Sequence, residues 1–140
     1  CKKGSNNRRK VITQIQIRHR KLANIRRNYI HQITAYLVKT KPSKIIVEYL
    51  KVSNMLKNRK LSREISQCGF YEFRRVLEYK CKFYGIGFQL ANQFFPSSKI
   101  CSVCGNKKSD LRLNDRIYEC DCCGIKINRD FNAAVNLSRL

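Results

Sequence analysis

The sequence predicts an α/β fold that carries a cysteine-rich insertion close to its C-terminal end. Three features lead to this prediction: a long helical periodicity at the start of the chain, two short runs of strand character, and two cysteine pairs with the spacing CxxC. With 140 residues, 43% of them hydrophobic and 28% charged, the chain is long and apolar enough to bury a core.

The first expected element is a long amphipathic helix over about residues 8–39. Its apolar stripe repeats every seven residues and consists of Ile15, Leu22, Tyr29 and Tyr36, with Val11, Ile25, Ile33 and Leu37 on the same face. A seven-residue repeat also occurs in coiled coils, but His19 and Arg26 interrupt this one. We therefore expect the helix to pack on a sheet.

A short strand is expected directly after this helix. Pro42 and Ser43 end the helical pattern, and residues 44–50 form an apolar run rich in β-branched side chains. The run predicts a buried strand. Glu48 at its exit is unusual, because an unpaired charge is costly to bury.

The remaining elements alternate between helix and strand. Residues 51–62 have the composition of a basic loop, residues 63–83 the pattern of a second helix, and residues 85–91 that of a second strand. The last helix is expected over residues 128–140. Asp130 lies in its first turn, where the helix dipole favours an anion.

The charge of the chain indicates a polyanionic partner. The 30 Lys and Arg residues outnumber the 9 Asp and Glu residues, giving a formal net charge of +21, and the first acidic residue is Glu48. Such a field concentrates polyanions around a protein, so nucleic acid is the leading partner. An anionic membrane surface or an acidic protein remains an alternative.

The sequence predicts no membrane segment. No stretch approaches the ~18 consecutive apolar residues that a transmembrane helix needs, and the first residues do not form a signal peptide. We therefore expect a cytoplasmic location, where thiols are reduced and clustered cysteines more often bind a metal than form disulfides.

Four cysteines predict a metal site of the zinc-ribbon type. Cys101 and Cys104 form one CxxC pair, Cys120 and Cys123 form the other, and a glycine follows each pair. Four thiolates complete a tetrahedral zinc sphere and leave no position for water, so the expected zinc is structural. Cys122 lies inside the second turn and is given no metal role. Disulfide-bonded or merely buried cysteines are the alternative.

Several segments in this order resemble a known protein family. The segments are residues 46–50, 55–58, 72–80, 95–105 and 128–134, with the sequences IVEYL, MLKN, EFRRVLEYK, FPSSKICSVCG and NRDFNAA. Together they resemble the OrfB (TnpB) proteins of bacterial insertion-sequence transposons, RNA-guided nucleases related to the compact type V CRISPR effectors. The resemblance extends from about residue 8 to residue 140.

The resemblance implies a partial RuvC domain, which has a ribonuclease-H-like fold and here lacks its first strands. In this interpretation residues 1–94 belong to the RuvC-like nuclease domain, residues 95–127 form the four-cysteine zinc ribbon, and residues 128–140 form the final RuvC-like helix. A missing N-terminal portion, or a completing partner chain, is expected to supply the rest of the sheet.

The resemblance also implies a nuclease site. Glu48 matches the family's second carboxylate and Asp130 its third, and such carboxylates hold two magnesium ions for phosphodiester cleavage. The first carboxylate has no counterpart, so we expect these 140 residues to be inactive alone. Tyr49 and Asn128 stand where the family usually has acids. A strand-end acid and a helix-cap acid are the structural alternatives for Glu48 and Asp130.

The expected function is therefore that of the C-terminal portion of a transposon-encoded, RNA-guided DNA endonuclease, a transposase accessory protein in DNA recombination. Its expected partners are DNA and a guide RNA. The basic residues expected to contact nucleic acid are Arg74, Arg75, Lys99 and Arg129. Two alternatives remain open: a non-cleaving zinc-ribbon module that binds nucleic acid, and a decayed transposase remnant.

Overall fold

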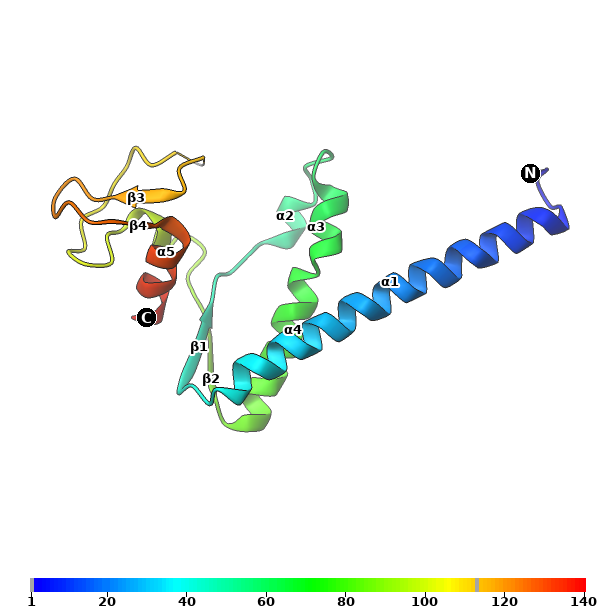
Figure 1. Cartoon of the computed structure of the whole chain (residues 1–140), viewed down its shortest axis with the longest axis horizontal. Helices are drawn as coiled ribbons and strands as arrows, with labels where there is room; N and C mark the ends of the chain where they lie inside the picture. The colour runs from blue at the N-terminus through cyan, green and yellow to red at the C-terminus, as the bar shows by residue number, and fades with distance from the viewer. Residues whose placement is uncertain (1, 113) are drawn as a thin grey trace. The chain divides into compact units, whose positions relative to one another are not determined.

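The computed structural model describes residues 2–112 and 114–140, which form two compact units. The helical unit consists of residues 2–41 and 52–85, and the strand unit of residues 42–51 and 86–140. Figure 1 shows the order of the helices and strands. Among the described residues, no helix combines the length and the apolar character needed to cross a lipid bilayer.

The helical unit is built on two long helices. Its elements are α1 (Asn6–Lys39), α2 (Val52–Met55), α3 (Ser62–Cys68) and α4 (Phe70–Tyr84). The side-chain oxygen of Ser5 caps α1 by accepting the N–H of Arg8. The expected helix at the start of the chain is thus confirmed, and the expected basic loop contains the short helix α2.

The packing face of α1 differs from the predicted one. Within the helical unit, the helix packs on α4 through its buried residues Ile30, Thr34 and Val38. Tyr29 and Tyr36 of the predicted stripe are 62% and 70% exposed. The seven-residue repeat was misleading because α4 is less than half as long as α1 and covers only part of it. The face of α1 that α4 contacts contains Ile30, the residue after the predicted Tyr29.

A glycine divides the predicted second helix in two. Gly69 has φ +66, a left-handed conformation that ends α3 and precedes α4. A Cβ atom at this position would lie 3.2 Å from Cδ1 of Ile30, so a larger residue would press on α1. The break allows α4 to bury Val76, Leu77 and Cys81.

The strand unit contains two small sheets and one helix. Its elements are β1 (Lys44–Val47), β2 (Gly87–Leu90), the 3-10 turn η1 (Ser97–Lys99), β3 (Ile117–Glu119), β4 (Lys126–Asn128) and α5 (Arg129–Ser138). Strands β1 and β2 are parallel, with Ile45 opposite Phe88, whereas β3 and β4 are antiparallel. Helix α5 packs against β1 and η1.

Both predicted strands of the parallel sheet are present, but they are shorter than expected. Residues 45–47 and 88–90 are only half-buried, so the prediction of a fully buried strand was wrong. The reason is that the described sheet has two strands, and α5 covers part of one face. Glu48 directly follows the last residue of β1.

Candidate functional site

The four predicted ligand cysteines lie together in the strand unit. The Sγ atoms of Cys101, Cys104, Cys120 and Cys123 all lie within 4.8 Å of one another. Two of these separations are 3.6 Å, between Cys101 and Cys123, and 3.5 Å, between Cys104 and Cys120. Ligands about 2.3 Å from a tetrahedral zinc are roughly 3.8 Å apart. The cluster therefore fits a four-thiolate metal site, and its separations are far from the ~2.05 Å of a disulfide.

The two CxxC turns have the same backbone hydrogen bonds. The N–H of Cys101 donates to the carbonyl of Asn106 (2.8 Å), and the N–H of Gly105 to that of Cys101 (2.9 Å). In the second turn the corresponding bonds, both 2.9 Å, join Cys120 to Ile125 and Gly124 to Cys120. Gly105 and Gly124 have φ +76 and +71, which explains why a glycine follows each pair.

Backbone N–H groups stabilise negative charge on the sulfurs. The N–H groups of Cys123 and Cys122 lower the pKa of Cys120 to about 6. At Cys104 the N–H of Asn106 also lowers the pKa, but burial and the neighbouring thiols outweigh it and raise the value to about 12. Near neutral pH the thiol of Cys104 therefore keeps its proton unless a cation replaces it.

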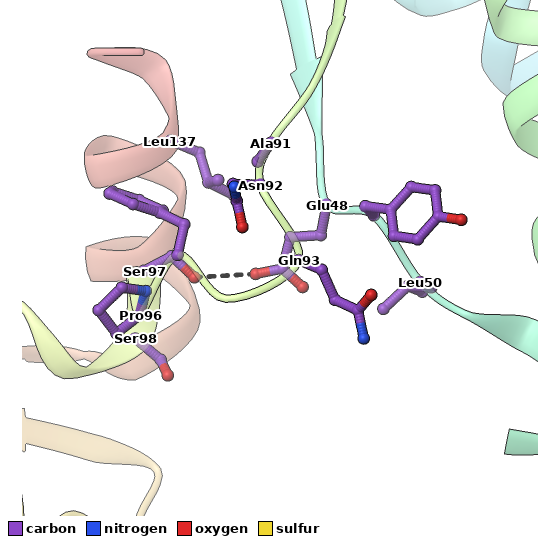
Figure 2. Close-up of a pocket in the computed structure, with 11 residues that line it drawn as sticks. Glu48, Leu50, Ala91, Asn92, Gln93, Pro96, Ser97, Ser98 and Leu137 are labelled. Atoms are coloured by element: carbon purple, nitrogen blue, oxygen red, sulfur yellow. Dashed lines mark hydrogen bonds between the residues drawn. The ribbon is translucent and has the colours of Figure 1, made fainter. Parts of the chain in front are cut away.

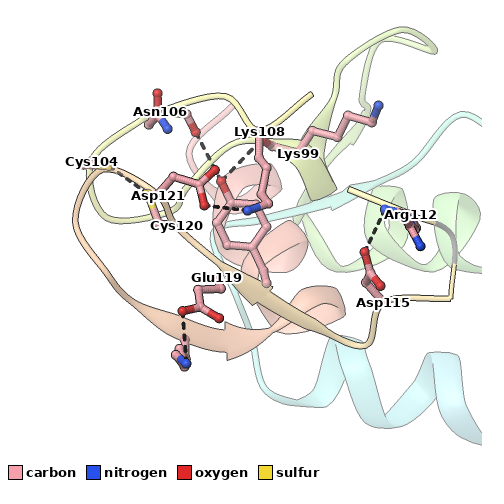
Figure 3. A network of polar contacts seen from close by, with 11 residues as sticks. Lys99, Cys104, Asn106, Lys108, Arg112, Asp115, Glu119, Cys120 and Asp121 are labelled. Atoms are coloured by element: carbon pink, nitrogen blue, oxygen red, sulfur yellow. Dashed lines mark hydrogen bonds and ion pairs between the residues drawn. The ribbon is translucent and has the colours of Figure 1, made fainter. Parts of the chain in front are cut away.

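The ribbon around the cysteines is held by a buried tyrosine and by ion pairs, of which Figure 3 shows the pair of Lys108 and Asp121. Tyr118 is fully buried, and its hydroxyl donates to the carbonyl of Asn106 at 3.3 Å. Burial raises the pKa of this hydroxyl to about 12, so it remains a donor. On the surface, Nζ of Lys108 lies 2.6 Å from Oδ1 of Asp121. These contacts fix the loops that carry the cysteines.

Glu48 lies at one edge of a second site in the same unit. It lines a pocket of about 200 Å³, together with residues 91–93 after β2, the turn around Ser97, and Leu137 of α5. The Oγ of Ser97 donates to Oε1 of Glu48 at 2.9 Å, as Figure 2 shows. Ser97 is buried, so it fixes one carboxylate oxygen and leaves the other available.

Asp130 lies in the first turn of α5 with its side chain 76% exposed. The side chain of Asn128 caps the helix by accepting the N–H groups of Asp130 (2.9 Å) and Phe131 (3.1 Å). Asp130 is not among the residues that line the Glu48 pocket. A neighbouring pocket of about 260 Å³ is lined by Ser43, Lys44 and Ile46 near the start of β1 and by Ala134, Leu137 and Ser138 of α5.

Two buried asparagines join α5 to the segment that leads into the cysteine ribbon. Asn132 is fully buried, accepts the N–H of Ser102 (2.9 Å) and donates to the carbonyl of Ile100 (2.7 Å). Asn136 donates to the carbonyls of Ser97 (2.8 Å) and Ile100 (2.7 Å). The cysteine cluster, Asp130 and the serine that binds Glu48 are therefore supported by the same helix.

Replacing Asn132 by alanine is expected to destabilise the strand unit. The change leaves the N–H of Ser102 without its buried acceptor and removes one donor to Ile100, a loss of about 2–4 kcal/mol. Urea unfolding checks this, with Asn114→Ala in an exposed loop as the control. Equal stability of the two variants would contradict the proposed supporting role.

The four predicted basic contacts lie in different environments. In the helical unit, Arg74 lies 5.6 Å from the ring centre of Tyr71, and Arg75 forms a bidentate pair with Glu72. In the strand unit, Lys99 donates to the carbonyl of Ser109 at 3.2 Å. Arg129 is only 16% exposed and donates to the carbonyl of Arg112 at 3.3 Å.

Sequence reasoning did not single out Ser97, Asn132 or Asn136. All three lie in or next to segments that carry the family resemblance, FPSSK and NRDFNAA. The available signal was a pair of asparagines four residues apart on an otherwise apolar helix face, because such a face buries polar groups only when they are hydrogen-bonded.

Comparisons with known proteins agree with the predicted resemblance. A family model described as the Cas12f1-like TNB domain matches residues 70–137. A putative RNA-guided DNA endonuclease of Streptomyces pristinaespiralis is 40% identical over 96% of this chain and 33% of its own length. The putative RNA-guided DNA endonuclease InsQ of Escherichia coli K12 is 37% identical over 96% of this chain and 37% of its own length.

A solved structure and further relatives extend these matches. The cryo-EM structure of a Cas12f1-sgRNA-target DNA complex matches 94% of this chain and 39% of its own chain, with a TM-score of 0.69 and 25% identity. Other relatives are named TnpB-like proteins, from Acanthamoeba polyphaga mimivirus. The mixed helix and strand fold and the resemblance to the TnpB family are thereby confirmed. The chain is similar to the TnpB-like and Cas12f1-like RNA-guided DNA endonucleases, and it spans about a third of the length of the curated relatives it matches.

Proposed function

We propose that the chain is the C-terminal, catalytic part of a transposon-encoded, RNA-guided DNA endonuclease. The observation that carries this proposal is the match of nearly the whole chain to relatives named as such endonucleases. The structural neighbour is a complex of Cas12f1 with sgRNA and target DNA, which supports DNA and a guide RNA as partners here.

The proposed architecture is a partial RuvC domain with an inserted ribbon. Its boundaries are those expected from the sequence: RuvC-like elements at residues 1–94 and 128–140, and the ribbon at residues 95–127. The parallel pair β1 and β2, with α5 packed on β1, supports this assignment. The missing strands of the sheet would come from an N-terminal portion or a completing partner chain.

Two kinds of metal site belong to this proposal. Zinc is the metal proposed for the four cysteines, because tetrahedral thiolate clusters of this size select it. Magnesium at carboxylates would activate water and stabilise the leaving oxygen of a phosphodiester. Glu48 and Asp130 are the proposed ligands, and Ser97 would orient the Glu48 carboxylate.

The two proposed ligands lie near different parts of α5 within the strand unit. Asp130 lies in the first turn of the helix, whereas the C-terminal half of α5 lines a pocket with the start of β1. Glu48 lies at the other end of β1, next to Leu137 in the first pocket. Both acids belong to one compact unit, which a common metal site requires.

The affinity of this chain for nucleic acid is expected to fall steeply as the salt concentration rises. Most of the salt-dependent phosphate contacts are expected to come from the helical unit. That unit has 20 Lys and Arg residues against 3 acidic residues, whereas the strand unit has 10 against 6. If the protein neutralises about six to ten phosphates, affinity should fall roughly 10³- to 10⁵-fold between about 50 and 200 mM salt. Fluorescence anisotropy against salt concentration measures this slope.

A matched pair of variants shows which of the two units provides the salt-dependent phosphate contacts. Changing Arg18 and Arg20 of α1 to glutamine should reduce the slope of log affinity against log salt concentration by about one to two. Changing Lys107 and Arg116 of the ribbon to glutamine should alter this slope less. Binding that does not depend on salt, or an absence of binding at low salt, would contradict the proposed function.

A further inference from the structure

One ridge of α4 carries planar side chains at every fourth residue and faces away from α1. Its members are Tyr71, Arg75, Tyr79 and Phe83, which recur with the spacing i, i+4 that forms a ridge on a helix surface. Tyr71, Tyr79 and Phe83 are 61%, 50% and 78% exposed. Successive members are separated by about 6 Å along the helix axis.

This ridge is not needed for the packing of the helical unit. The residues that α4 buries are Val76 and Lys80, on the ridge next to this one, and Leu77 and Cys81, on the opposite ridge. Among these buried residues, Lys80 donates from its Nζ to the carbonyl of His31 (2.6 Å) and to Oγ1 of Thr34 (2.9 Å). These polar contacts to α1 therefore also come from the buried residues of α4 and not from the aromatic ridge. Three large exposed aromatic rings in a row are unusual for a solvated surface.

The planar groups of the ridge are held by their neighbours. Glu72 accepts two hydrogen bonds from Arg75, at 2.7 and 2.9 Å, and fixes the plane of the guanidinium. Arg74 lies over the ring of Tyr71, 5.6 Å from its centre. Tyr84 packs edge-on against Phe83 with ring centres 5.1 Å apart. The ridge therefore offers pre-oriented flat surfaces at little further cost in side-chain entropy.

We propose that the Tyr71–Phe83 ridge is a stacking platform for unpaired nucleotides. Aromatic rings and guanidinium planes stack on bases whose faces are free, whereas the bases of a duplex cover one another. The surrounding unit has a net charge of +17, which attracts the phosphates of such a strand. The proposal rests on the proposed nucleic-acid function and specifies that this surface binds single-stranded rather than duplex nucleic acid. An unpaired segment of RNA and a displaced DNA strand share the required chemistry.

The test compares single-stranded with duplex probes of about 15 nucleotides. The double variant Tyr79→Ala and Phe83→Ala should lower affinity for poly-dT or poly-U by at least about tenfold, because each stacked base contributes about 1–3 kcal/mol. Affinity for a duplex of equal length should change by less than about twofold, since the phosphate contacts remain. A larger loss of affinity for poly-U than for poly-dT assigns the platform to RNA, and the reverse assigns it to DNA.

Two control variants make the result specific. Tyr79→Phe with Phe83→Tyr keeps the flat surfaces and should retain single-strand affinity, and Tyr36→Ala removes an equally exposed tyrosine from α1. Equal losses for single strand and duplex, a loss matched by Tyr36→Ala, or no loss at all would overturn the platform. If the unaltered chain binds neither probe, the proposed function itself fails. Capture of a protein on this ridge without single-strand binding would also contradict the inference.

Discussion

Replacing Asp130 or Glu48 by alanine is expected to abolish magnesium-dependent DNA cleavage. The assay uses a protein that joins this chain to the upstream two thirds of a TnpB-like relative, because the chain spans only about a third of the length of such relatives. Each variant should lower the cleavage rate by at least about a thousandfold, or ~4 kcal/mol in activation free energy. The reason is that hard divalent cations need oxygen ligands, and Glu48 is the only carboxylate among the described residues that line its pocket.

The control for this experiment is Asp110→Ala, which removes an equally charged acid from an exposed ribbon loop. Cleavage should continue at close to the unaltered rate in this variant. Circular dichroism and nucleic-acid binding should be unchanged in all three variants, so that a loss of cleavage is separated from a loss of folding. Cleavage that survives Asp130→Ala would show that the proposed catalytic role is wrong.

Replacing Cys104 by serine is expected to remove the metal from the ribbon and to unfold it locally. Elemental analysis of the unaltered chain should give about one zinc per molecule, and the variant should retain little, since a serine hydroxyl is a poor zinc ligand. Structural zinc contributes roughly 10–16 kcal/mol of apparent binding free energy to folding. Among the described residues of the ribbon, the buried hydrophobic cluster consists of Tyr118 and two of the ligand cysteines, Cys101 and Cys120, so losing the metal disturbs the core itself.

Cys122→Ser is the matched control for the metal experiment. Cys122 is an exposed cysteine of the same turn and is not a member of the four-sulfur cluster. This variant should keep both the zinc and the protection of the Tyr118 and Cys120 amides from hydrogen exchange. Zinc retained in full by Cys104→Ser, or lost in Cys122→Ser, would exclude the assigned ligand set.

Local patterns in the sequence were sufficient for the elements and the cysteine cluster. Periodicity placed α1 and the β-branched run placed β1, because these signals depend on residues close in the chain. The two CxxC-Gly turns predicted a cluster whose sulfurs do lie together, because each turn fixes two of them locally. The glycine break at Gly69 was missed, since a single glycine within a helical pattern is often tolerated.

Features that depend on distant residues could not be predicted. Whether Tyr29 or Ile30 of α1 is buried depends on where α4 contacts the helix, which is a tertiary property. The same is true of Ser97, which meets Glu48 from a segment about fifty residues later, and of Asn132, which bonds the ribbon. The proposed roles of Glu48 and Asp130 come from the resemblance, because a charge at the end of a strand and an acid in the first turn of a helix do not by themselves indicate a metal site.

The most direct test of the account is the location of a divalent ion relative to Glu48 and Asp130. Manganese can replace magnesium at carboxylates, and its anomalous scattering locates it in crystals of the extended protein bound to DNA. A shared metal site predicts a manganese ion within ligand distance of both carboxylates, and its loss in Asp130→Ala. A manganese ion bound elsewhere, or the two carboxylates on opposite faces of the β1–β2 sheet, would contradict it.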